Sequence, residues 1–422
     1  MPASAEHPIV TTTVAMDRAL DAGGGIVRLA PTWVPRVFCT PGGRLKLHPD
    51  DLFPFAEGRG GIDERWLSST VRAENGPLTG EFEGISMVVG HGDHLIPFDA
   101  FVAHHGAALI GERLWSAYQG WPMYAKFFDN ATPLPLHFHH RDADAAALGK
   151  KGKPEAYFFP PQMNAHLGSL GITFFGLHPE TTRAQFTERL ERFARGGDNR
   201  ITELSRGYRI RLGTGWDVPA GVLHAPASIC TYEPQRASDV SCLCESWSNS
   251  REIMSELLWK NVPADRVGDL GYIIELLDWE RNVDPRFLTR NMMEPVESRA
   301  SAAARDDWTE RWVVYLASEF SAKELTVQPG SSVTIRDTDA FGCIVIEGQG
   351  SLNGHPVSSP TTIRYGQLTE DEWFVSEAAA RAGVTIANPS RTEPLVLLKH
   401  FGPESGELTA DRAALEALRR EG

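Results

Sequence analysis

Pro133-Leu-Pro-Leu-His137-Phe-His139-His140 is the segment from which the fold of this chain is best approached. His137 and His139 are two residues apart, so on a β-strand both side chains leave the same face while Phe138 points to the other. Two imidazoles on one face of a strand form a bidentate platform for a metal ion. Two histidines spaced in this way more often lie at a surface or pack in a core. A metal site therefore needs further ligands elsewhere in the sequence.

Two later segments offer such ligands. Lys-Pro-Glu at 153–155 places a carboxylate at the start of an apolar run, and Pro-Ala-Gly-Val-Leu-His at 219–224 places an imidazole just after a proline–glycine turn. Three imidazoles and one carboxylate suit Zn²⁺, Mn²⁺, Fe²⁺, Co²⁺ or Ni²⁺, whose ligand preferences overlap. The sequence therefore predicts a site for one divalent ion. Its candidate ligands are His137, His139, Glu155 and His224.

Most apolar segments are short, rich in β-branched and aromatic residues, and bounded by glycine or proline. Such segments are typical of strands, so the chain is expected to be mainly β. The clearest expected strands are 172–177, 208–212, 312–316, 325–327, 332–335, 343–346, 384–386 and 395–398.

Two stretches have helical periodicity instead, at about 179–206 and 250–290. In the first, apolar residues recur four and three positions apart from Phe186 to Phe193, and Thr181 or Thr182 can cap the helix. In the second, Pro263 is expected to split the helical region in two.

A small, polar and charged segment, 297–307, has the composition of linkers and surface helices. It predicts a boundary between a metal-binding domain, residues 1–296, which carries both helical insertions, and a second domain, residues 297–422. The strands of the second domain are spaced as in a small antiparallel sandwich or barrel. It contains no His-x-His pair with a partner glutamate, so it is expected to be structural and to lack metal ligands.

Charge and composition narrow the classes of partner. The 422 residues carry a formal charge of −14, which repels phosphate and excludes a nucleic-acid binder that works by bulk electrostatics. No apolar run approaches the roughly 18 residues of a membrane span, and the first residues lack the pattern of a secretory signal. The five cysteines are an odd, scattered set, typical of reduced thiols. A cytoplasmic protein without nucleic-acid or membrane partners is expected.

Five segments, in order, resemble one family, the class I phosphomannose isomerases, which are zinc-dependent members of the cupin superfamily. Residues 122–139 resemble the family's stretch from Lys-Phe-Leu-Asp-Ala into Pro-Leu-Ser-(Ile/Val)-Gln-Val-His. The other four are 64–66 (Glu-x-Trp), 153–155 (Lys-Pro-Glu), 218–225 (Ile-Pro-Ala-Gly-x-x-His-Ala) and 233–240 (Glu-x-Gln-x-x-Ser-Asp). The resemblance covers about residues 60 to 245. It implies a bicupin, that is, two β-barrel or jelly-roll domains with helical insertions.

Carried over by position, the resemblance makes His139, Glu155 and His224 metal ligands, with Zn²⁺ as the leading metal, and places His137 where the family usually has glutamine. It also places Lys153 beside the metal as a catalytic lysine. The implied activity is that of an aldose–ketose isomerase or epimerase acting on a sugar or sugar phosphate. A small carbohydrate is therefore the expected substrate, and a homodimer is one option for the assembly.

The sequence departs from the family after Ser-Asp at 238–239, where Val-Ser-Cys-Leu replaces a segment that contains an arginine. Arg290 is a candidate replacement for that cation, the alternative being a surface arginine at a helix end. Glu233 and Asp239 are candidates for acid–base work, or they pair with arginine.

Two other functions remain open at this point. The same ligands suit an Fe²⁺-dependent cupin oxygenase or lyase, and the missing arginine suits a catalytically inactive, sugar-binding regulatory protein. Four further histidines are interpreted as loop and core residues, with a second site as the alternative. They are His91, His94, His104 and His105.

Overall fold

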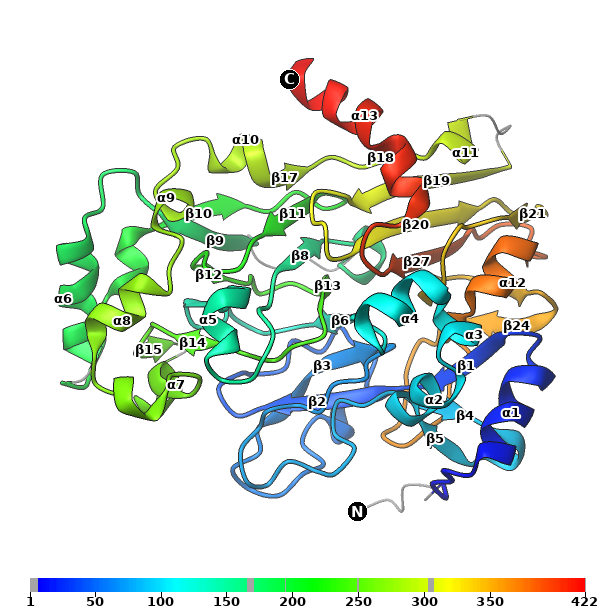
Figure 1. Cartoon of the computed structure of the whole chain (residues 1–422), viewed down its shortest axis with the longest axis horizontal. Coiled ribbons are helices and arrows are strands. Elements are labelled where there is room, and N and C mark those ends of the chain that lie inside the picture. Colours follow the sequence, from blue (N-terminus) through cyan, green and yellow to red (C-terminus); the bar gives the residue numbers. More distant parts are fainter. Residues whose placement is uncertain (1–6, 165–170, 194, 249, 303–306, 422) are drawn as a thin grey trace.

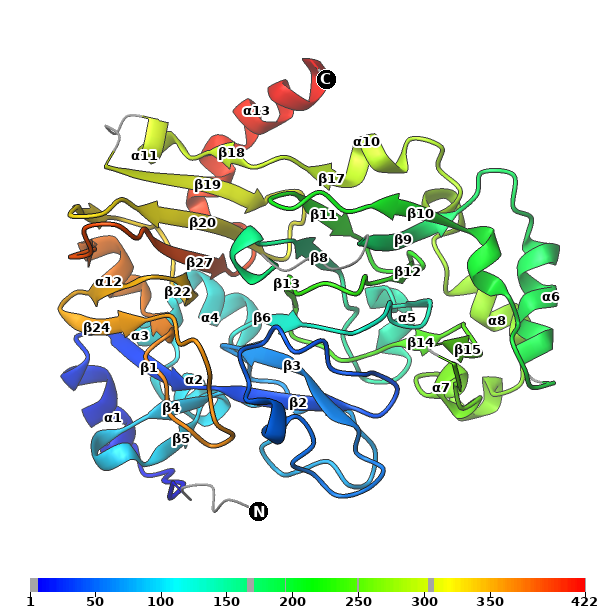
Figure 2. The ribbon, with the colours of Figure 1, turned by 180° about the vertical axis from the view of Figure 1, so that it is seen from behind.

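The computed structural model describes residues 7–164, 171–193, 195–248, 250–302 and 307–421. Their strands form antiparallel sheets that gather into two β-rich regions side by side along the long axis of the molecule (Figure 1). The same division is visible from behind (Figure 2). The expectation of a mainly β chain is confirmed.

The first region consists of a seven-stranded sheet and a five-stranded sheet. The order across the seven-stranded sheet is β17 (Met292–Met293), β11 (Gly215–Val218), β8 (Glu155–Phe158), β13 (Thr231–Arg236), β6 (Met123–Phe128), β3 (Gly61–Leu67) and β2 (Thr32–Arg36). The order across the five-stranded sheet is β10 (Ser205–Arg209), β9 (Ile172–Leu177), β12 (His224–Ala225), β7 (His137–Phe138) and β14 (Cys242–Leu243).

The second region consists of a nine-stranded sheet and a four-stranded sheet. The order across the nine-stranded sheet is β18 (Val296–Glu297), β19 (Trp308–Val314), β20 (Ser321–Val327), β27 (Leu395–Phe401), β22 (Phe341–Glu347), β25 (Glu372–Val375), β1 (Ile26–Ala30), β4 (Met87–Val89) and β5 (Leu95–Pro97). The four-stranded sheet runs β21 (Ser332–Ile335), β26 (Val384–Ala387), β23 (Gln349–Leu352) and β24 (His355–Ser358). A separate hairpin pairs β15 (Trp247–Ser248) with β16 (Arg251–Glu252).

The helices are mostly short. They are α1 (Thr13–Ala22), α2 (Phe98–His105), α3 (Ala107–Ile110), α4 (Glu112–Tyr118), α5 (Asp142–Ala146), α6 (Arg183–Phe193), α7 (Glu256–Trp259), α8 (Leu270–Glu275), α9 (Trp279–Asn282), α10 (Phe287–Asn291), α11 (Arg299–Ala302), α12 (Glu377–Ala382) and α13 (Gly406–Glu421). The 3₁₀ turns are η1 (Pro49–Asp51), η2 (His91–Asp93), η3 (Pro161–Met163), η4 (Ile201–Leu204) and η5 (Ala264–Arg266).

Three strands from the N-terminal part of the chain, β1, β4 and β5, lie in the nine-stranded sheet of the second region. Residues 26–28 of β1 pair with residues 373–375 of β25, and β4 and β5 extend the sheet from β1. The domain boundary at residue 297 therefore stays a prediction, to which the structure adds that strands from the first hundred residues complete the C-terminal sheet.

Two of the expected strands, 172–177 and 332–335, coincide with β9 and β21. The strand expected at 208–212 lies three residues earlier in the chain, as β10. Ile172 begins β9 and pairs with Arg209, so the ladder has no partner beyond that residue.

The two helical insertions pack on each other at one end of the molecule, on the left in Figure 1. Thr182 and Gln185 begin α6 with a capping box, in which each backbone N–H donates to the other residue's side chain at 2.8 and 3.3 Å. Phe186 of α6 and Ile273 of α8 share a buried core with Phe138 of β7. The apolar face of β7 is therefore turned toward the helices, which leaves the histidine face to the interior of the first region.

The strand register aligns the polar side chains of the interior. His224 of β12 pairs directly with His137 of β7. In the opposite sheet Glu155 begins β8 and pairs with Gln235 of β13, two residues from Glu233, which pairs with Lys126 of β6. Side chains from strands far apart in sequence are brought to one place by this pairing.

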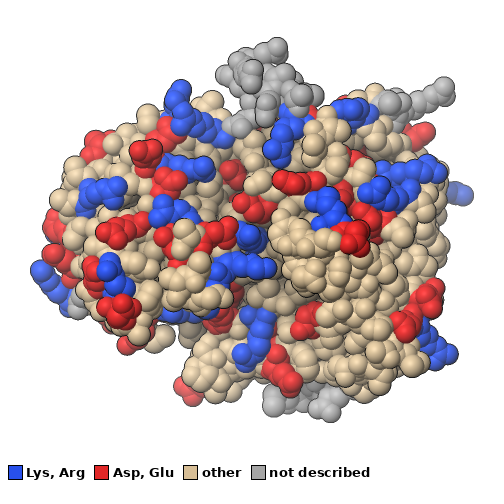
Figure 3. Space-filling view, in the orientation of Figure 1, with Lys and Arg blue, Asp and Glu red and all other residues tan. Residues whose placement is uncertain are grey.

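On the face shown in Figure 3, acidic and basic side chains are interspersed, and no continuous patch of one sign covers it. Within the ranges that the structure describes, no helix combines the length and the apolar character required to cross a lipid bilayer.

Candidate metal centre

A cavity lies between the two sheets of the first region, with about 520 Å³ of space including its mouth. Its lining is strongly charged, and basic and acidic groups alternate around it. The basic residues are Arg36, Lys126, Lys153 and Lys260, and the acidic ones are Glu64, Glu155, Glu233 and Asp239. His137 and His139 also line the cavity, and His224 lies directly behind them.

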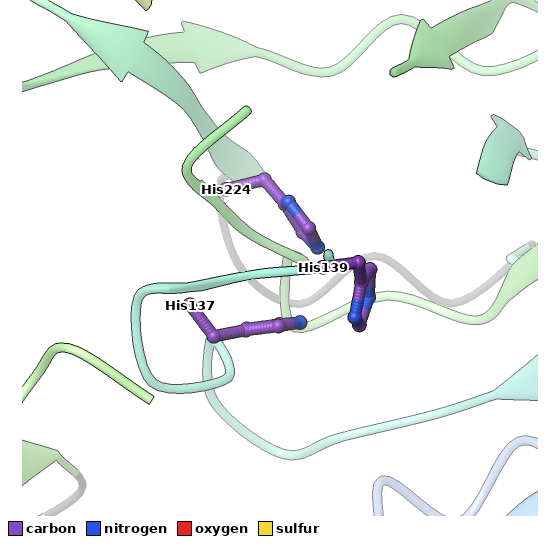
Figure 4. A group of neighbouring side chains, drawn as sticks. All are labelled: His137, His139 and His224. Atoms are coloured by element: carbon purple, nitrogen blue, oxygen red, sulfur yellow. The ribbon is translucent and has the colours of Figure 1, made fainter. Parts of the chain in front are cut away.

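The three histidines converge. One ring nitrogen from each of His137, His139 and His224 lies within 4.8 Å of the others. The ring centroids of His137 and His224 are 4.2 Å apart, and the ring of His139 lies about as close, at 5.1 and 5.0 Å. Figure 4 shows the rings turned toward a common point.

The backbone holds each ring in one tautomer. Nδ1 of His137, His139 and His224 lies 2.7, 2.7 and 2.8 Å from the carbonyl oxygens of Pro135, Val240 and Val222. A carbonyl only accepts, so each Nδ1 carries the proton and each Nε2 presents a lone pair toward the centre. A hydrogen bond from the remote ring nitrogen to a carbonyl oxygen is usual for histidines that bind metal.

Glu155 completes the group from the opposite sheet. Its Oε2 lies 2.9 Å from Nε2 of His139, and its Oε1 lies 3.1 Å from Nε2 of His224. The buried Tyr157 hydroxyl donates to the same carboxylate at 2.6 Å and fixes its orientation. Burial opposes the charge, but the Lys153 ammonium group beside it favours the ionised form, and the pKa of Glu155 lies well below its usual range.

Burial also keeps the histidines neutral. It lowers the pKa of His137 well below its ordinary value, with His224 adding to the effect. Burial and the nearby Lys153 lower the pKa of His139 to about 3. Neutral imidazoles and an ionised carboxylate are the forms that coordinate metal.

These residues fit a divalent ion. Within the described chain, Nε2 of His224 is buried without a hydrogen-bond partner, an arrangement that is costly unless a further ligand satisfies it. Three imidazole nitrogens and a carboxylate oxygen match zinc and the neighbouring first-row metals. The sequence-based candidates therefore come together, and their role as ligands stays a prediction.

Lys153 lies beside this group. Its Nζ is 3.1 Å from Nε2 of His139, 3.2 Å from Oε2 of Glu155 and 3.9 Å from Oε1 of Glu233. The ammonium group is thus shared by both carboxylates in a site that is almost entirely buried.

Glu233 continues the polar chain away from the histidines. Lys126 bridges it to Glu64, with Nζ 3.2 Å from a carboxylate oxygen of each. Burial and the charge of Glu155 raise the pKa of Glu233 well above its usual range, whereas Arg36 and Lys126, against the effect of burial, hold the pKa of Glu64 below its own.

Asp239 pairs with arginine, one of the two alternatives expected for it. Its two oxygens accept from Arg36 at 3.2 and 3.0 Å, and the Nε of Arg36 donates to Glu64 at 3.0 Å. A cation therefore stands in the cavity although the family's arginine segment is absent. Arg36 was not among the predicted site residues, because it comes from β2, a strand that carries none of the motifs.

The structure does not bring Arg290 into this group. Its side chain lies on α10, more than half exposed, 2.5 Å from Asp284, and it is not among the residues that line the cavity. Glu64 and Lys126 were not assigned either, although both lie in motif segments. Charged residues inside strands that are otherwise apolar are the signal that could have found them, because such residues are seldom buried without a partner.

A second group of carboxylates lies in the second region. Glu310, Asp337 and Glu407 come within 4.8 Å of one another, but the Lys323 and Lys399 ammonium groups lie among them. Lys323 Nζ is 3.0 Å from Glu310 and 3.2 Å from Asp337, and Lys399 Nζ is 2.9 Å from Glu310. Two cations already compensate this cluster.

Comparison with solved structures shows which known proteins share this fold. The chain superposes on the mannose 6-phosphate isomerase of Bacillus subtilis with a TM-score of 0.54 at 16% identity, over 89% of this chain and 99% of that one. A phosphomannose isomerase variant from Salmonella typhimurium gives a TM-score of 0.60 at 11% identity, over 90% and 100%. The chain has the fold of these isomerases.

The resemblance inferred from the motifs is thus confirmed at the level of the fold, and it extends beyond residues 60 to 245 to nearly the whole chain. A further similar structure is a mannose 6-phosphate isomerase bound with zinc and yttrium, with a TM-score of 0.59 at 11% identity, over 90% of this chain and 100% of that one. No protein-family model and no curated protein matches the sequence.

Proposed function

We propose that the chain is a metal-dependent aldose–ketose isomerase that acts on a sugar or sugar phosphate. The observation that carries the proposal is the convergence of three histidine nitrogens, two of which lie within 3.1 Å of the Glu155 carboxylate, with the Lys153 ammonium group 3.2 Å from the same carboxylate. The likeness in fold to mannose 6-phosphate isomerases supports it.

The reaction moves a proton between adjacent carbons through an enediol, so the site needs a proton carrier and a stabiliser for the negative oxygen. His137, His139, Glu155 and His224 would hold a divalent ion, which would supply a Lewis acid for the carbonyl group of the substrate. Zn²⁺ is the leading candidate for this ion, and Mn²⁺, Fe²⁺, Co²⁺ and Ni²⁺ suit the same donors.

Lys153 and Glu233 provide the path for the proton. Their Nζ and Oε1 are 3.9 Å apart, and both groups line the cavity. Lys153 lies beside the proposed ligands and therefore beside the reacting carbons. Glu233, 3.9 Å away, takes up the proton that the ammonium group releases, and the neutral amine then takes the proton from one carbon and returns it to the next. Burial of both groups excludes bulk water, which protects the enediol from side reactions.

Arg36 and Asp239 position Glu233 through two intermediate residues. Arg36, paired with Asp239, donates to Glu64. Glu64 in turn orients Lys126, whose ammonium group lies against Glu233. Asp239 is thus assigned a positioning role, with its oxygens engaged by Arg36 and by the backbone N–H of Glu74 at 2.8 Å.

Lys260 favours a phosphorylated substrate. Of the four basic residues in the lining, the other three each lie within 4.0 Å of a carboxylate, but no such pair is found for Lys260 among the described residues. Its Nζ donates to the carbonyl oxygen of Glu74 at 2.8 Å and retains two further N–H groups. A substrate anion at the mouth can accept them.

A panel of aldoses and aldose phosphates, tested for ketose formation with the chain loaded with Zn²⁺, Mn²⁺ or Fe²⁺, tests the proposal. Conversion of one of them, abolished by chelation and restored by metal, is the expected result. Oxygen consumption with the Fe²⁺-loaded chain would instead support the oxygenase, and saturable sugar binding without conversion would support the regulatory protein.

A further inference from the structure

A second group of metal-binding side chains lies outside the cavity, between α1 and α2. Asp17 comes from α1, and His104 and His105 end α2. One ligand atom from each lies within 4.8 Å of the other two, as the ring nitrogens of the three histidines in the cavity do. In Figure 1 these two helices lie together at the end of the molecule opposite the helical insertions.

The three side chains already face one another. Nε2 of His104 is 2.7 Å from a carboxylate oxygen of Asp17, and the rings of His104 and His105 lie edge to face with centroids 4.6 Å apart. Successive residues on a helix point about 100° apart, so the two rings meet because both are drawn toward α1.

The environment of His105 resembles that of the histidines in the cavity. A hydrogen bond to the backbone of Met16 holds its ring, and its Nε2 is buried with no hydrogen-bond partner in the described ranges. One nitrogen is therefore fixed by α1 and the other is available as a ligand. Burial also lowers the pKa of His105, which favours the neutral form of the ring.

Asp17 and His104 give this site access and adaptability. Their side chains are 57% and 27% exposed, so an ion can reach them and they can adjust to its coordination distances. Two imidazoles and one carboxylate, with positions open to water, suit Zn²⁺, Ni²⁺ or Cu²⁺ better than the oxygen-seeking Ca²⁺ or Mg²⁺.

We propose that Asp17, His104 and His105 form a second divalent-metal site, selective for late first-row cations such as Zn²⁺, that fastens α1 to α2. The link has a structural consequence. α1 leads through a glycine turn into β1, which pairs with β25, so an ion here ties the N-terminal helix to the sheet of the second region. Because the unfolded chain does not present the three ligands together, binding stabilises the fold.

The test titrates Zn²⁺ alone into the metal-free full chain and counts the sites by calorimetry. It is carried out in the H224A background, which removes the proposed cavity site from the count. The expected result is one remaining Zn²⁺ per chain with a dissociation constant in the micromolar range or tighter, and a thermal midpoint that rises with Zn²⁺. Both effects are lost in H104A and reduced at least tenfold in affinity in D17N.

His91→Ala is the matched control, since this exposed histidine lies near α1 but outside the group. It is expected to keep the Zn²⁺ and the thermal shift. Equal losses in H91A and H104A, or binding only at millimolar Zn²⁺, would overturn the site. The wild-type background then separates the two proposals, because H104A is expected to retain the cavity metal and full isomerase activity.

Discussion

His137 and His224 face each other across the β7–β12 pair, in direct register and with ring centroids 4.2 Å apart. Their positions are 87 residues apart in the chain, and the pairing places both on the inner face of the five-stranded sheet. The opposite sheet contributes Glu155 to the same point. The proposed chemistry follows from this closure of two sheets around a small set of buried donors.

Lys153→Met tests the proton carrier. The substitution keeps the bulk of the side chain but removes the ammonium group, so we expect kcat to fall by roughly 10²- to 10⁴-fold, the usual contribution of a positioned acid or base, while the metal is retained. Steady-state kinetics and metal analysis of the same preparation check this. Lys151→Met, two residues earlier and exposed, is the control. Normal turnover in K153M would remove Lys153 from the mechanism.

Tyr157→Phe tests the support of a metal ligand. The Tyr157 hydroxyl donates to Glu155 at 2.6 Å, so its loss frees the carboxylate to rotate and should weaken metal binding by about 10- to 100-fold. A competition titration with a chelator measures the change. Tyr124→Phe, a buried tyrosine whose hydroxyl contacts the carbonyl of Ser238, should leave the affinity unchanged. Equal affinities for Y157F and Y124F would contradict the orienting role.

Lys260→Ala tests the substrate anion. Hydrogen bonds to charged groups are worth roughly 1.5–3 kcal/mol, so KM for a phosphorylated sugar should rise by about tenfold or more, with kcat little changed. Arg290→Ala tests the cation that the sequence suggested instead. A larger effect in R290A than in K260A would restore that suggestion, and equal KM values for all three proteins would favour a free sugar.

His400→Gln tests a pH dependence that is independent of the metal. Burial lowers the pKa of His400 to about 3, and its Nδ1 lies 3.0 Å from the Tyr232 hydroxyl. The unfolded chain binds a proton at this residue below about pH 6.5, but the folded chain does not. The free energy of unfolding therefore decreases as the pH falls from 6.5 toward 3. Well below pH 6.5 the decrease is about 1.4 kcal/mol per pH unit.

Denaturant titrations at pH 7, 6 and 5 measure this slope. H400Q should reduce the slope by the contribution of one titrating group, because glutamine can accept the same hydrogen bond without titrating. His91→Gln, at an exposed position, serves as the control. Parallel slopes for wild type and H400Q would mean that His400 titrates equally in the folded and unfolded chains.

Much of the fold was accessible from local patterns. β-Branched and aromatic residues between glycine and proline boundaries predicted strands such as β9 and β21, and the spacing of Phe186 and Phe193 predicted α6. The membership of the sheets was not accessible. β1 pairs with β25, nearly 350 residues later, and no pattern within either strand encodes that choice.

The site residues also fall into those that the sequence could predict and those that it could not. The spacing of His137 and His139, and the turn before His224, carried enough information to bring the proposed ligands together. Arg36 and Glu64 could not be placed beside Asp239, because their meeting depends on β2 and β3 closing the seven-stranded sheet. Arg290 was suggested because a cation was missing from a motif, whereas the fold brings Arg36 to the cavity from β2.

Metal content of His224→Ala is the most direct test of the four proposed ligands. Purified chains are loaded with Zn²⁺, dialysed and analysed by mass spectrometry for metal, in the H104A background so that an ion between α1 and α2 does not contribute. The account predicts one Zn²⁺ per chain with His224 present and none in H224A, with folding verified by circular dichroism. One equivalent of Zn²⁺ retained by a folded H224A chain would contradict it.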